Sequence, residues 1–136
     1  MTATQITLVK SSWKMVAADA DAAGALFYNR LFDIAPELKP MFKADITEQS
    51  KKLMYMIGYV INKLDKLDDV IGEVAAMAKR HAGYGVRDEH YTIVGSALLW
   101  TLEKGLAEHW TEEVKTAWIT CYTLLSSSMI QAAKAA

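Results

Sequence analysis

The sequence has few of the residues that cross-link chains or break helices. Cys121 is the only cysteine among 136 residues, and the two prolines are Pro36 and Pro40. One cysteine excludes a disulfide within the chain, so a packed core must hold the fold together. We expect Cys121 itself to be an inert, packed thiol. Both prolines lie in a short segment that ends at Phe42, which concentrates the helix-breaking residues at one corner.

The sequence also lacks an excess of either charge and any long apolar run. Lys and Arg number 15 and Asp and Glu number 16, for a net charge of −1. No basic stripe is present, so no nucleic-acid partner is predicted. The longest apolar run, residues 53–61, falls far short of the ~20 residues that a membrane span needs. Because the N-terminus also lacks a basic and apolar leader, we expect a cytoplasmic protein.

Apolar residues make up 52% of the chain and recur at helical spacing nearly throughout. Val9, Trp13 and Val16, for example, fall on one face of a first helix. No segment has the alternation that is typical of a strand. Candidate N-caps precede several of the apolar stripes: Thr4, Thr47, Asp88 and Thr111. The sequence therefore predicts one all-α domain over residues 1–136, with six to eight helices.

Three histidines are available as metal ligands, and only His81 lies on the apolar stripe of its helix. A histidine in this position is by itself more often a core residue than a ligand. His90 and His109 are expected to be solvated surface residues. No Cys, His and carboxylate cluster has zinc spacing, and no glycine-rich phosphate loop or nucleophile elbow occurs. The residues thus give no support to a hydrolase or a nucleotide-binding protein.

Several segments, in order and at consistent intervals, are similar to those of one known family. These are FYNRLF (27–32), PELKPMF (36–42), KRH (79–81), EHYTIVG (89–95) and AWITCY (117–122). On these segments the whole chain resembles the globins, specifically the bacterial single-domain globins related to the haem domain of flavohaemoglobins. The resemblance implies a globin fold around a haem pocket. Gly24 and Ser50 are small residues where two helices of that family cross closely.

The resemblance also implies the roles of individual residues. His81 would be the proximal ligand of a non-covalent haem b, since no CxxCH motif occurs. Tyr28 and Gln49 would donate hydrogen bonds to bound oxygen on the distal side. The alternatives are an aromatic core residue for Tyr28 and a solvated residue for Gln49. The pocket wall would comprise Phe42, Leu53, Met77, Val86 and Tyr91, with Lys52 at a haem propionate or simply solvated.

Two departures from flavohaemoglobins bear on function. In that family a last-helix glutamate joins the tyrosine matching Tyr91 in polarising the proximal histidine, but no acid follows Glu113 here. We therefore expect less electron donation to iron and less peroxidase-like chemistry. The chain also ends at Ala136 without a flavin or nicotinamide domain, so any electrons would come from a separate reductase.

The resulting functional prediction is a haem protein that binds O2, NO and CO reversibly. Removal of NO by dioxygenation, with a separate reductase, is a linked prediction, and the sequence leaves enzymatic activity open. Two alternatives are a haem-based gas sensor and a haem-free helical interaction protein.

Overall fold

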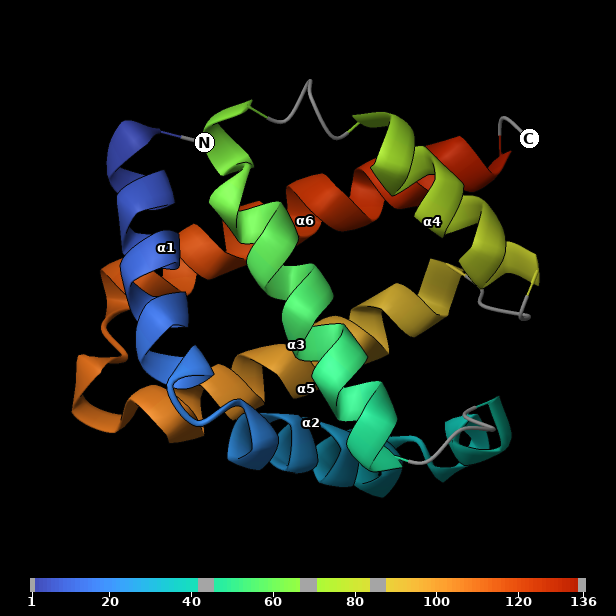
Figure 1. The fold of residues 1–136 in the computed structure, drawn as a ribbon, viewed down its shortest axis with the longest axis horizontal. Coiled ribbons are helices and arrows are strands. Elements are labelled where there is room, and N and C mark those ends of the chain that lie inside the picture. The colour runs from blue at the N-terminus through green and yellow to red at the C-terminus, as the bar shows by residue number, and fades with distance from the viewer. Residues whose placement is uncertain (1, 42–45, 67–70, 84–87, 135–136) are drawn as a thin grey trace.

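The computed structural model describes residues 2–41, 46–66, 71–83 and 88–134, and its helices are drawn in Figure 1. The α-helices, in chain order, are α1 (Ala3–Ala17), α2 (Ala20–Ile34), α3 (Ile46–Asn62), α4 (Ile71–Gly83), α5 (Asp88–Leu106) and α6 (Glu112–Lys134). Short 3-10 segments, η1 (Pro36–Met41) and η3 (Ala107–His109), follow α2 and α5. The all-α prediction is confirmed, because these ranges contain six α-helices and no strand.

Side-chain caps fix the starts of the first and last helices. The Thr2 hydroxyl accepts the Gln5 N–H at 3.1 Å, and the Gln5 side chain accepts the Thr2 N–H at 3.0 Å. This reciprocal pair satisfies two backbone donors that the first turn leaves open. Thr111 caps α6 as predicted, because its hydroxyl accepts the Val114 N–H at 3.2 Å.

The other predicted caps were wrong by one or two positions. Thr4 lies inside α1, which Thr2 caps, and Thr47 lies inside α3, which begins at Ile46. Asp88 is the first residue of α5 rather than the residue before it. A short polar side chain in the first turn gives the same sequence signal as a cap, so the pattern locates a helix start only approximately.

The proline corner forms where the sequence predicted it. α2 ends at Ile34, two residues before Pro36, because the residue before a proline disfavours the helical conformation. Both prolines then lie in η1, and Leu38 of that segment is buried. The corner thus turns the chain sharply and still contributes a side chain to the core.

The helices pack around two clusters of buried apolar side chains. α2 packs against α3 and α5, while α1 and α4 both pack against α6 (Figure 1). The larger cluster joins α1, α3, α5 and α6, and includes Trp13, Leu102 and Trp118. The smaller one, named here the Tyr28 cluster, has Phe27, Tyr28, Leu31, Ala35, Leu38 and Ala97 at its centre.

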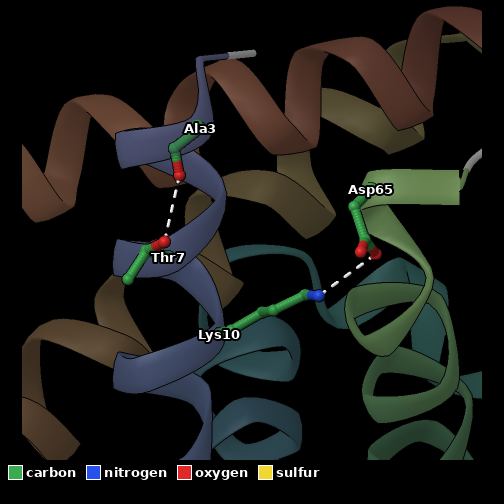
Figure 2. A network of polar contacts seen from close by, with 4 residues as sticks. All are labelled: Ala3, Thr7, Lys10 and Asp65. Carbon is green, nitrogen blue, oxygen red and sulfur yellow. Dashed lines mark hydrogen bonds and ion pairs between the residues drawn. The ribbon is translucent and has the colours of Figure 1, made fainter.

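An ion pair joins α1 to the segment that follows α3. The Lys10 ammonium donates to the Asp65 carboxylate at 3.1 Å, and Figure 2 shows the pair beside the Thr7 hydroxyl, which donates to the Ala3 carbonyl. The hydrogen bond from Lys10 lowers the pKa of Asp65, with a further contribution from the backbone of Asp65. The two residues of the pair are 55 positions apart in the sequence.

No helix within the described ranges is both long enough and apolar enough to cross a membrane.

Candidate functional site

Tyr28 is a buried residue at the centre of the Tyr28 cluster. Its side chain is 3% exposed, and its ring packs edge-on against Phe27, with the ring centroids 5.0 Å apart. The Phe32 ring lies 5.9 Å away on the other side of it. Five half-buried apolar residues pack against the cluster from α2, α3 and α5: Phe32, Leu53, Ile93, Val94 and Leu98. The phenol ring is therefore packed among apolar side chains.

The surroundings of Tyr28 determine its protonation state. Burial raises the pKa of the Tyr28 hydroxyl from 10.0 to about 12, because an apolar environment disfavours the charged phenolate. The hydroxyl therefore keeps its proton at any physiological pH. A neutral O–H can both donate and accept a hydrogen bond, whereas a phenolate can only accept.

A close crossing of two helices brings α3 next to Tyr28. Gly24 lies one turn before Tyr28 in α2, and a methyl group built on it would lie 2.6 Å from the Ser50 Cβ. Only glycine allows this approach, which agrees with the close crossing predicted at this pair. Beside Ser50 on α3, Gln49 is half-buried, and Leu53 packs against the Tyr28 cluster.

Two of the predicted site residues, Tyr28 and Leu53, belong to the same apolar cluster. Gln49 lies on α3 beside Ser50, the residue that packs on Gly24 of α2. Lys52 is exposed to solvent on α3, as either of its predicted roles requires. Phe42 lies outside the described residues.

α4 carries the predicted proximal residues Met77 and His81. Val74 and Ala78 of α4 are buried, and Met77 is half-buried. His81 belongs to this helix, four residues after Met77, but its side chain lies outside the described set, as does Val86. The Tyr59 hydroxyl donates to the Glu73 carboxylate at 3.1 Å and so connects α3 to the first turn of α4.

Tyr91 lies in the first turn of α5 and is half-buried. Its backbone carbonyl accepts a 2.5 Å hydrogen bond from the Tyr122 hydroxyl on α6. No role was predicted for Tyr122. The only available signal was Gly95, a glycine inside a helical stripe, where a close contact is often the reason.

The other histidines and the cysteine are placed as follows. His109 is exposed in η3, 4.0 Å from the Glu108 carboxylate, which agrees with a surface residue. His90 is half-buried in the first turn of α5, so it is less exposed than the predicted solvated residue. Cys121 is 2% exposed, and its burial confirms the predicted packed thiol.

The residues around Tyr28 fit a haem. A haem is a large apolar plate that requires an apolar wall, together with few and well-placed polar groups on the side that binds gas. The Tyr28 cluster supplies such a wall, and Tyr28 places a buried hydroxyl within it. This composition suits a haem with a neutral diatomic ligand.

Comparisons with known proteins agree with this assignment. Residues 25–129 match the family model described as Globin. An anaerobic nitrite reductase of Physcomitrium patens is 31% identical, over 90% of this chain and 76% of its own length. A flavohemoprotein of Vibrio cholerae is 30% identical over 96% of this chain, which spans only 34% of that relative.

Solved structures show the same relationship. A bacterial globin from Campylobacter jejuni superposes with a TM-score of 0.84 at 28% identity, over 98% of this chain and 96% of the other. An engineered carbene transferase from Rhodothermus marinus shares the fold at 22% identity, with a TM-score of 0.88 over 98% and 94% of the two chains. The chain belongs to the globin family, whose members are haem proteins that bind small gases.

Proposed function

We propose that this globin binds oxygen reversibly at a non-covalent haem b, which His81 would hold through its iron, with Tyr28 as the principal hydrogen-bond donor to the gas. The observation that carries the proposal is Tyr28, a neutral phenol that is 3% exposed in an apolar cluster. When bound, the haem supplies an iron that coordinates diatomic gases. The residues of the chain decide how tightly each gas is held.

His81 would hold the iron of the haem through one imidazole nitrogen. An imidazole that binds iron through one nitrogen needs an acceptor for its other N–H, which fixes the tautomer. We assign this role to the Met77 carbonyl, four residues earlier in α4. A neutral carbonyl polarises the imidazole less than a carboxylate does, which favours gas storage over peroxidase-like chemistry.

On the distal side, Tyr28 donates its O–H to the gas, and Gln49 acts as a second donor through its amide. Both groups stabilise negative charge on the ligand, so they favour oxygen over carbon monoxide. Leu53, Met77 and Tyr91 contribute to the wall. Phe42 and Val86 are assigned to that wall by family resemblance, and Lys52 to a haem propionate.

Haem titration of the purified protein tests the proposal. The parent should develop a Soret band, and His81→Ala should fail to retain haem while keeping its helical content by circular dichroism. His90→Ala and His109→Ala are matched controls that should bind haem as the parent does. No Soret band in the parent would leave the haem-free helical interaction protein. An unchanged proximal spectrum in His81→Ala would refute the ligand assignment.

Dioxygenation of NO is a second candidate, favoured by the 30% identity to a flavohemoprotein. In this reaction NO, O2 and one electron give nitrate, and a separate reductase supplies the electron. The role of Tyr28 would be to hold oxygen until NO arrives. Stopped-flow measurement of nitrate, with a reductase present, separates this enzyme from a simple carrier. Because a 31% identical relative is a nitrite reductase, nitrite consumption without oxygen belongs in the same experiment.

A further inference from the structure

α4, the helix that carries His81, has one main neighbour in the fold. It packs along α6 (Figure 1), and within the described ranges no other helix packs on it extensively. α3, in contrast, packs against both α1 and α2. The position of α4 relative to α3 therefore depends on few contacts among the described residues.

A hydrogen bond between side chains joins α4 to α3. The Tyr59 hydroxyl, in the last turn of α3, donates to the Glu73 carboxylate, in the first turn of α4, at 3.1 Å. Tyr59 is half-buried, whereas Glu73 is exposed. Because the acceptor is ionised, this bond is stronger than one between two neutral groups. The pair is thus a specific link between two helices that share little other packing.

Glu73 lies on the same face of α4 as the predicted proximal residues. Glu73, Met77 and His81 follow one another at intervals of four residues, and positions with this spacing fall on one side of a helix. On α3, Leu53 of the predicted pocket packs against the Tyr28 cluster. The hydrogen bond therefore connects a helix of the predicted distal side to the face of α4 that carries the predicted proximal ligand.

We propose that Tyr59 and Glu73 are positioning residues for the haem: their hydrogen bond holds α4, and with it His81, next to α3 and so slows the loss of haem. The proposal rests on the proposed haem binding. Both residues act through the position of α4 rather than by contact with the gas. Without the bond, α4 keeps its packing on α6, so it should stay folded but separate from α3 more often.

Transfer of haem from the loaded protein to an excess of a haem-scavenging protein, followed in the Soret band, tests the proposal. Tyr59→Phe keeps the ring and removes the hydroxyl. It should speed haem loss about threefold, within the range of about two- to tenfold that one hydrogen bond gives. The matched control is Tyr55→Phe, which removes the same group one turn earlier on α3, where Tyr55 is 72% exposed. That variant should lose haem at the rate of the parent.

Variants of Glu73 test the other partner. Glu73→Ala removes the acceptor and should also speed haem loss, whereas Glu73→Gln keeps an acceptor oxygen and should lie between Glu73→Ala and the parent. Tyr59→Phe combined with Glu73→Ala should lose haem no faster than Glu73→Ala alone, because both changes remove the same bond. A combined variant in which the two accelerations multiply would overturn the proposal. Equal rates in Tyr59→Phe and Tyr55→Phe would overturn it as well, and either result would leave haem binding intact.

Hydrogen exchange of the haem-free protein measures the same link without the haem. In Tyr59→Phe the amides of α4 should exchange about threefold faster than in the parent, while those of α1 should be unchanged, because a local contact has been lost. Equal acceleration in α4 and α1 would indicate a general loss of stability and would overturn the positioning role. A parent that develops no Soret band with haem would overturn the proposed function and the positioning role together.

Discussion

The Tyr122 hydroxyl on α6 donates a 2.5 Å hydrogen bond to the Tyr91 carbonyl in the first turn of α5. The phenol ring lies against Gly95, the residue one turn further along α5. Burial raises the pKa of Tyr122 above its usual range, and the neighbouring Tyr91 raises it further. The hydroxyl therefore stays protonated and pins the start of α5 to α6.

Gly95→Ala should destabilise the protein, although alanine is the better helix former. The added methyl group would lie 2.6 Å from the Tyr122 Cε2, so the ring must move and its hydrogen bond to Tyr91 must stretch. Overpacking of this kind costs about 1–3 kcal/mol, measurable by urea unfolding. The control is Gly105→Ala on the same helix, where the new methyl group meets Val16 at 3.6 Å. In that variant the free energy of unfolding should rise by about 0.5–1 kcal/mol. A loss of stability in both variants would contradict this account, because it would show that α5 tolerates no alanine in place of glycine, whether or not Tyr122 lies against it.

Ser12→Ala should lower the free energy of unfolding by more than the loss of one hydroxyl suggests. The Trp118 indole N–H donates to the Ser12 Oγ at 2.8 Å between two buried side chains. Without that oxygen the buried N–H has no acceptor, and an unsatisfied donor costs about 1–3 kcal/mol. Ser11→Ala is the matched control, because Ser11 is exposed on the same helix and should change stability by less than about 0.5 kcal/mol. Equal unfolding free energies for the two variants would contradict this account.

Residue pattern alone was sufficient for the helices, because apolar spacing predicted an all-α chain and the structure is all-α. The close crossing at Gly24 and Ser50 was implied by the resemblance to globins, and the structure contains it.

Hydrogen bonds between residues far apart in the sequence could not be predicted from it. The Ser12–Trp118 hydrogen bond spans 106 positions, and the Tyr122–Tyr91 bond spans 31. Neither follows from periodicity, because each depends on how two helices pack.

The stability of the protein should fall at alkaline pH, in part through Cys121. Burial raises the pKa of its thiol from 9.0 to about 11. Between these values only the unfolded chain loses the proton, so the free energy of unfolding decreases as the pH rises, by up to about 2–3 kcal/mol. Urea unfolding at pH 8 and pH 10 measures the change. Cys121→Ala should show a shallower loss over the same interval. Identical pH dependence in parent and variant would assign the whole loss to other groups, such as Tyr28.

Tyr28→Phe should speed oxygen dissociation from the haem-loaded protein by about 10- to 150-fold. The substitution keeps the ring that packs between Phe27 and Phe32 and removes only the hydroxyl. A hydrogen bond to a partly charged group contributes roughly 1.5–3 kcal/mol, which corresponds to that range of rates. Burial holds the pKa of Tyr28 at about 12, so oxygen dissociation from the parent should be independent of pH between about 6 and 9.

Gln49→Leu should give a smaller acceleration than Tyr28→Phe, because Gln49 is only half-buried and shares its hydrogen-bonding capacity with water. Carbon monoxide carries little negative charge, so its dissociation should change far less in both variants. Stopped-flow displacement of each gas measures these rates, and Lys51→Gln provides an exposed control on the same helix as Gln49. If oxygen dissociation from Tyr28→Phe stays within about twofold of the parent, or if carbon monoxide responds as strongly as oxygen, then Tyr28 is an aromatic core residue and the donor to the gas must be another group.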